Sequence, residues 1–313
     1  MQKKVSTERD RFWKGFILAS IGTALFSVKS IFIKLAYAAG SDPESVLLLR
    51  MLIAAPFFFV IALWQWRSNV HFRQTAHAGL LLKIMLVGFI GYYLASLLDL
   101  KGLALISAQL ERMLLFTYPI MVAILGFLFF KQPLSIKMGL ALLFSYLGIS
   151  LIYQQEARFS GAEIALGTLL VLLSALSFSF YVLFSKQLIQ KLGSVPFTSV
   201  AMLFSTLFML LHYGLLMEHE VLINNEILLW TVLLAIFSTV VPSFMISSAI
   251  GLIGPAQTGI VGTLGPLVTL ILAVTFLGEQ FTYFHLAGFC LVVLGVSLLT
   301  LRFKKGTTKR NDL

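Results

Sequence analysis

Charged residues are scarce in this chain of 313 residues. Only 12% of them are Asp, Glu, Lys or Arg, whereas 59% are hydrophobic. A soluble domain has about 25% charged residues, so this chain has too little polar material to cover a water-soluble globule. The composition therefore excludes an ordinary soluble domain and indicates a protein that is surrounded largely by lipid.

Cysteine is almost absent, and so are the common cofactor motifs. The single cysteine, Cys290, excludes an internal disulfide bond, and no Cys or His residues have the spacing of a metal site. The phosphate-binding motif GxxxxGK[ST] is missing as well. We therefore predict no metal and no other cofactor. The net charge of +10 comes from Lys and Arg at the ends of apolar segments, which argues against nucleic-acid binding.

Long apolar segments, by contrast, follow one another from end to end with short connections between them. About 20 apolar residues suffice for a helix to cross the hydrocarbon core of a membrane. The sequence therefore predicts an all-α integral membrane protein. The ten transmembrane helices that we predict cover residues 12–39, 44–66, 78–100, 103–130, 134–153, 163–190, 195–217, 226–249, 253–277 and 281–301.

The basic residues of the connections gather on one side of the predicted membrane. Lys and Arg fall mainly in the even-numbered loops and in the tails, residues 1–11 and 302–313, while acidic residues such as Asp99 are assigned to the odd-numbered loops. Loops rich in Lys and Arg stay in the cytoplasm. We therefore expect a multi-pass protein of the cell membrane with both termini cytoplasmic, which requires an even number of spans.

The sequence also repeats itself. An offset of 147 residues aligns Pro119 with Pro266 and "LGISLIY" at 147–153 with "LGVSLLT" at 294–300. We predict two five-helix repeats, at residues 12–153 and 163–301. Because five is odd, the two repeats would insert in opposite senses. Such an inverted repeat is the architecture of transporters that open a central site alternately to either side.

These features carry a family resemblance. The segment "FLGEQFTYFHLAGFCLVVLGVSL" at 276–298 and its weaker copy "YPIMVAILGFLFFKQPLS" at 118–135 resemble the closing signature of EamA-type members of the drug/metabolite transporter superfamily. Arg50 fits the family too, although Gln132 replaces an expected Glu and the second half lacks a counterpart of Arg50. The resemblance implies transport of amino acids, nucleotide-linked sugars or other metabolites across a bacterial inner membrane.

Four charged residues stand out within the predicted spans: Lys29, Arg50, Glu111 and Arg112. Charges within the bilayer are candidates for function. At 1.5 Å per residue, Lys29, Glu111 and Arg50 would lie at depths of ~15, ~12 and ~9 Å. We hypothesise that Glu111 pairs with one cation while the others form a positive pocket for a carboxylate or phosphate. The alternative is a structural ion-pair cluster, with Arg50 extended outward.

Prolines at matching positions suggest interrupted helices. Pro119 and Pro266 each remove one backbone hydrogen bond in mid-span, and transporters place substrates at such breaks. A kink needed only for packing is the alternative. Gln109, Gln257 and Thr258 lie nearby in the sequence and are predicted to line the pocket.

The function that combines these features is secondary transport of a small polar metabolite, an amino acid or another anionic or zwitterionic solute. Alternating access would be driven by a gradient or by exchange, with protons or a counter-substrate as coupling partner. Two alternatives are an intramembrane enzyme acting on a lipid, for which His71 and His77 lack a nearby carboxylate, and a membrane scaffold or sensor. The substrate, the direction of transport and the existence of a homodimer stay open.

Overall fold

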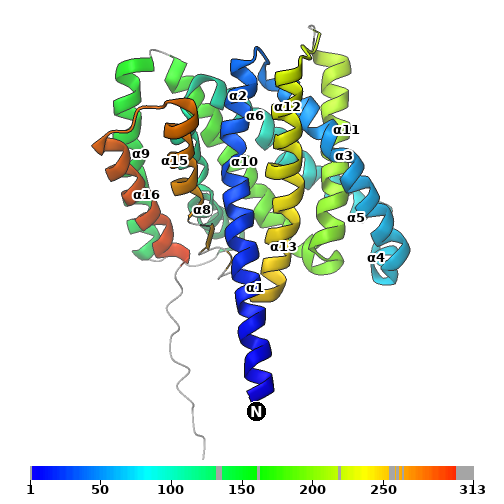
Figure 1. Cartoon of the computed structure of the whole chain (residues 1–313). Helices are drawn as coiled ribbons and strands as arrows, with labels where there is room; N and C mark the ends of the chain where they lie inside the picture. The colour runs from blue at the N-terminus through cyan, green and yellow to red at the C-terminus, as the bar shows by residue number, and fades with distance from the viewer. Residues whose placement is uncertain are drawn as a thin grey trace, which may run out of the picture.

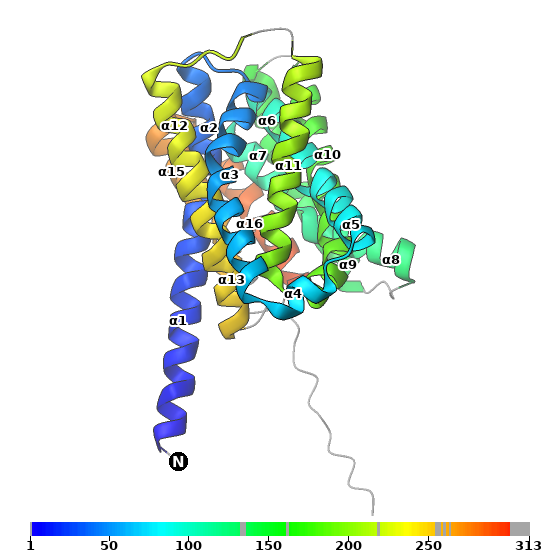
Figure 2. The same cartoon turned by 90° about the vertical axis from the view of Figure 1, so that its right-hand side faces the viewer.

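The computed structural model describes residues 2–131, 136–160, 163–217, 220–253, 258, 261–262 and 264–300. Throughout these ranges the regular structure is helical and no strand occurs. The helices stand side by side in a bundle, and the first helix extends beyond it at one end (Figures 1 and 2). The all-α prediction is thereby confirmed.

The first half of the chain forms ten helical segments. They are α1 (Gln2–Ser27), α2 (Lys29–Ala38), α3 (Pro43–Ser68), α4 (Val70–Thr75), α5 (Ala78–Gly88), the π-helix η1 (Phe89–Leu94), α6 (Ala95–Leu105), α7 (Ala108–Leu115), α8 (Tyr118–Phe130) and α9 (Ile136–Ser160). The helices of the second half are α10 (Glu163–Leu192), α11 (Ser194–Leu216), α12 (Asn225–Ala235), the π-helix η2 (Ile236–Val240), α13 (Val241–Ile253), α15 (Gly265–Leu277) and α16 (Tyr283–Thr300).

Many of these helices suit a membrane. By length and composition, seven helical segments of the described chain could cross one: Asp10–Ala38, Pro43–Ser68, Ala78–Leu105, Ala108–Phe129, Glu163–Leu192, Ser194–Leu216 and Asn225–Ile246. Gly265–Leu277 and Tyr283–Leu298 are shorter apolar helices. Large apolar side chains such as Phe59, Leu128 and Phe276 are exposed, as expected for surfaces that face lipid. The chain is a multi-pass membrane protein, and the exact number of ten spans stays a prediction.

Polar residues at the helix starts fix where several helices begin. The Asp42 side chain accepts hydrogen bonds from the backbone N–H groups of Glu44 and Ser45, and Pro43 opens α3. The Ser107 hydroxyl accepts from the N–H of Leu110 at the start of α7. Such caps satisfy N–H groups that have no partner within the helix.

The internal repeat is visible in the irregular features of the helices. The π-helices η1 and η2 begin 147 residues apart, and so do α8 and α15, which also end 147 residues apart. Each of these last two helices is followed by a residue in the left-handed region, Lys131 (φ 52°) after α8 and Gly278 (φ 65°) after α15. The offset read from the sequence therefore reproduces the breaks and caps of the backbone.

Equivalent helices of the two halves pack against each other in opposite directions. In α9 and α16, Gly148 lies against Gly288, and Gly295 lies against Ala141, so one helix rises while the other descends. The absence of side chains at these glycines allows the two backbones to approach closely. The same antiparallel order holds for α3 and α11, because His212 near the end of α11 lies 3.8 Å from Glu44 at the start of α3.

Candidate functional site

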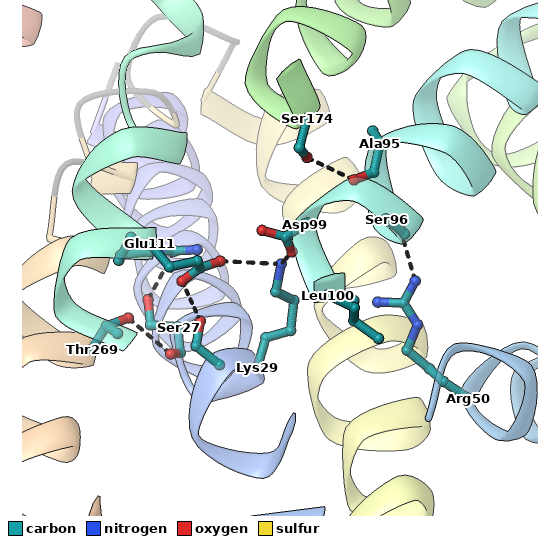
Figure 3. Close-up of polar contacts among 12 residues, drawn as sticks. Ser27, Lys29, Arg50, Ala95, Ser96, Asp99, Leu100, Glu111, Ser174 and Thr269 are labelled. Carbon is teal, nitrogen blue, oxygen red and sulfur yellow. Dashed lines mark hydrogen bonds and ion pairs between the residues drawn. The ribbon is translucent and has the colours of Figure 1, made fainter. Parts of the chain in front are cut away.

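A cluster of buried charges lies where the first span is interrupted. α1 ends at Ser27 and α2 begins at Lys29, so the predicted continuous helix over 12–39 is broken at Val28. The Lys29 ammonium forms an ion pair with the Asp99 carboxylate of α6, and its Nζ lies 3.6 Å from Oε1 of Glu111 on α7 (Figure 3). The structure therefore brings the predicted residues Lys29 and Glu111 together.

Asp99 was missed by the sequence analysis, which counted it with the loop after the third span although it lies just inside the predicted end of that span at residue 100. The helix instead continues to Leu105, and Asp99 is buried inside α6. The apolar residues that follow it, including Leu100 and Leu103, carry the helical pattern past the charge and could have revealed the extension. Three bases therefore face two acids in this region, and not one acid as predicted.

Glu111 is fully buried and held by two neighbours. The hydroxyl of Ser30 donates a hydrogen bond of 2.7 Å to Oε2 of Glu111, while Lys29 faces the other carboxylate oxygen. Both partners come from the first turn of α2. The start of α2 therefore fixes the position of this carboxylate.

Arg112 connects the cluster to the second half of the chain. Its Nη2 donates a hydrogen bond of 3.2 Å to the hydroxyl of Ser27. The backbone carbonyl of Ser27 in turn accepts a hydrogen bond of 2.8 Å from the hydroxyl of Thr269 on α15. A Cβ atom at Gly265 would lie 2.8 Å from the same guanidinium, so α15 approaches Arg112 closely because this position carries no side chain. The site therefore lies at a contact between the two repeats.

Arg50 occupies a separate position beside α6. Its Nη2 donates a hydrogen bond of 2.9 Å to the hydroxyl of Ser96, one turn before Asp99 (Figure 3). The side chain is buried in the protein instead of extending outward. The contact with Glu111 that the depth argument allowed is not formed, because Arg50 points to the opposite side of α6.

Several polar atoms of these residues have no hydrogen-bond partner within the described chain. The donors are Nε of Arg50 and Nε of Arg112, and the acceptors are Oδ1 of Asp99 and Oε1 of Glu111. With all groups ionised, the three bases Lys29, Arg50 and Arg112 exceed Asp99 and Glu111 by one positive charge, and protonation of a carboxylate would increase that excess. Buried polar groups are normally satisfied, so these donors could receive an anionic group.

The two prolines lie next to interruptions of the helical hydrogen bonding, and the residues just before them stay in the right-handed helical region. α7 ends at Leu115, and Pro119 lies in the first turn of α8; Pro266 likewise lies in the first turn of α15. Proline is tolerated in the first turn because its missing N–H would have no partner there. The hydroxyl of Thr117 donates 2.6 Å to the carbonyl of Leu114 and so satisfies one acceptor at the break.

The predicted lining residues do not all join the charge cluster. Gln109 is 2% exposed and lines a second region, a cavity near Glu156 and Glu279 at the far end of α7. Thr258 is buried, and Gln257 lies outside the described residues. The sequence analysis did not consider Glu156, which it placed in a loop.

No candidate metal centre is present in the described part of the chain, where three or more His, Cys, Asp or Glu side chains never gather in a suitable group. The site is instead an arrangement of paired and unpaired charges at a helix break inside a multi-pass membrane protein. Buried charges and interrupted helices of this kind are typical of membrane transport proteins.

Comparison with known proteins agrees with that class. The EamA-like transporter family matches residues 13–154 and again residues 165–301, so the chain belongs to this family and contains its domain twice. The uncharacterized transporter YcbK of Bacillus subtilis (strain 168) is 29% identical over 282 residues, which cover 88% of each chain. The uncharacterized transporter sll1319 of Synechocystis sp. is 27% identical over 280 residues, 86% of this chain and 82% of that protein.

A solved structure supports the fold. One crystal structure superposes with a TM-score of 0.64, covers 92% of this chain and 97% of its own, and is 13% identical in sequence. At that identity the likeness shows the fold alone. Family and relatives together make this protein a membrane transporter.

Proposed function

We propose that the protein is a secondary transporter that moves a small polar metabolite, an amino acid or another anionic or zwitterionic solute, by alternating access. Ten transmembrane helices would form two inverted five-helix repeats in the bacterial inner membrane, with both termini in the cytoplasm. A gradient or exchange, with protons or a counter-substrate as coupling partner, would supply the energy.

The packing of equivalent helices supports the inverted repeat. Two copies related by an axis in the membrane plane must have equivalent helices that run in opposite directions, and α9 with α16 and α3 with α11 do so. Because the two halves would contain the same number of membrane spans, the total number of spans would be even. A reporter fused after Lys305 should be cytoplasmic and one within 154–162 external. A C-terminal reporter outside the cell would contradict this topology.

The observation that carries the substrate class is the excess of buried positive charge at the break between α1 and α2. Lys29 is shared between two carboxylates, whereas Arg112 donates a hydrogen bond to the hydroxyl of Ser27, interacts with Glu111 electrostatically and keeps an unpartnered Nε. A carboxylate or phosphate of the solute would satisfy that guanidinium. The opposite repeat contributes Gly265 and Thr269 to the same place, so movement between the repeats would change the site.

The test is a binding screen followed by a transport assay. Purified protein is heated in the presence of amino acids, nucleotides and organic acids, since a ligand at 100 times its dissociation constant stabilises by about 2.7 kcal/mol. The solute that stabilises is then loaded into proteoliposomes, and exchange with labelled external solute is measured. We expect an anionic or zwitterionic solute to bind and to exchange.

Two variants sharpen the assay. Lys29→Met should abolish or strongly weaken binding of that solute, whereas Lys101→Met, which removes a lysine from the pair with Glu44 at the protein surface, should leave it unchanged. Glu111→Gln should prevent accumulation against a proton gradient and keep part of the exchange. Stabilisation by neutral solutes alone, equal in wild type and Lys29→Met, would refute the proposed substrate class.

A further inference from the structure

A second polar cavity lies at the start of α7, at the end of the molecule opposite the N-terminus. It has a volume of about 240 Å³ and is bounded by three parts of the chain. Residues from the α6–α7 junction, the end of α9 and the segment from α15 to α16 face it, among them Ser107, Gln109, Glu156, Glu279, Gln280 and His285. The transport proposal makes no use of this cavity.

Gln109 presents an unused acceptor there. The residue is 2% exposed, and its Nε2 donates a hydrogen bond of 3.3 Å to the carbonyl of Gln280. That bond fixes the orientation of the amide, because only the nitrogen can donate to a carbonyl. The amide oxygen Oε1 then lacks a partner although it is buried. A ligand at this position must therefore donate a hydrogen bond.

Two carboxylates give the cavity a negative charge. Glu279 accepts from the backbone N–H groups of Ala108 (2.7 Å) and Gln109 (3.2 Å). Glu156 accepts from the N–H and the hydroxyl of Ser107. Each carboxylate oxygen has two lone pairs, so both groups keep capacity to accept further bonds after these contacts.

One cation partly balances these acids. Lys34 of α2 interacts electrostatically with Glu279 and Glu156, but no ion pair within 4 Å joins it to either of these described residues. Burial raises the pKa of Glu156 to about 7, so the two carboxylates and the one ammonium leave a net charge of −1 above that pH and close to zero below it. The surroundings therefore favour one additional positive charge that carries N–H donors.

We propose that this cavity binds the ammonium group of a small solute, with Gln109 Oε1 and the carboxylates of Glu156 and Glu279 as acceptors. This site is distinct from the charge cluster around Lys29, because none of the residues that line the cavity belongs to that cluster. Binding here is measurable without any flux, so it stands or fails separately from the transport activity.

The experiment uses the full-length protein in lipid nanodiscs and three probes at equal ionic strength. Ethylammonium has N–H donors and a charge, tetramethylammonium has the charge without donors, and acetate has the opposite charge. Ligand-observed NMR measures the dissociation constant of each. We expect ethylammonium to bind about tenfold or more tightly than tetramethylammonium, as for one hydrogen bond to a charged group, and acetate not to compete.

Three variants test the assignment. Gln109→Leu should weaken ethylammonium binding about tenfold, and Gln109→Glu, which adds a charge at the same place, should strengthen it. Gln187→Leu makes the same change at an exposed position of α10 and should have no effect. If ethylammonium and tetramethylammonium bind equally to the wild type, or if Gln109→Glu binds ethylammonium no better, the assignment is wrong. The wild-type comparison decides even if a variant fails to fold.

Discussion

Replacing Lys29 by Met should destabilise the protein strongly, because it removes the only cation that contacts two buried carboxylates in the described site. At 3.6 Å and an effective dielectric constant of 20, the attraction between Lys29 and Glu111 is about 4–5 kcal/mol, and Asp99 is closer still. Measurements on other buried pairs place the loss of stability at about 3–5 kcal/mol when one partner is removed.

The matched double variant separates charge from packing. Lys29→Met with Asp99→Asn removes one charge of each sign, so we expect it to recover more than half of the stability that Lys29→Met loses. Lys101→Met is the control, because its pair with Glu44 has side chains that are 42% and 20% exposed, and exposed pairs contribute about 0–1 kcal/mol.

The assay is unfolding by SDS in mixed micelles, with the free energy extrapolated to the absence of SDS. It is run at pH 7. A loss below 1 kcal/mol at pH 7, equal to that of Lys101→Met, would refute the buried ion-pair cluster. A double variant less stable than Lys29→Met would refute the argument from charge balance.

Two further predictions concern glycines and backbone conformation. Gly148→Ala should be about 1–3 kcal/mol less stable than Gly139→Ala in the same unfolding assay. A Cβ atom at residue 148 would lie 2.5 Å from the carbonyl oxygen of Gly288, whereas no described atom lies within 4 Å of a Cβ atom at residue 139. Equal stabilities of the two variants would contradict the tight α9–α16 contact. Lys131→Gly should stabilise the protein by about 1 kcal/mol, and Gly278→Ala should destabilise it by a similar amount, because both residues have left-handed backbone conformations. A loss of stability in Lys131→Gly would contradict the left-handed conformation at the end of α8.

The sequence was sufficient to predict an all-helical membrane protein with an internal repeat, because the relevant signals are local. Apolar length identifies membrane helices one at a time, and the repeat offset of 147 reappears in the start and end of α8 and α15. The same locality explains the errors. Nothing near Val28 marks the break between α1 and α2, since neither proline nor glycine stands there.

The candidate site was predictable only in part, because its members are joined by tertiary contacts. The rule that buried charges are functional identified Lys29, Glu111 and Arg112, but the partner Asp99 was set aside once it was assigned to a loop. Arg50 shared the predicted depth of the others and yet bonds to Ser96, since depth does not specify which face of a helix a side chain occupies.

The paired π-helices record the order in which this molecule was assembled. A π-turn contains one residue more than an α-turn. Because η1 and η2 occupy the same place in both halves, the simplest history is that the extra residue entered one ancestral five-helix chain before that chain was duplicated. The interruption at Val28 has no counterpart in the continuous helix α10, so the two copies share the π-helix and differ at the place where Lys29 stands.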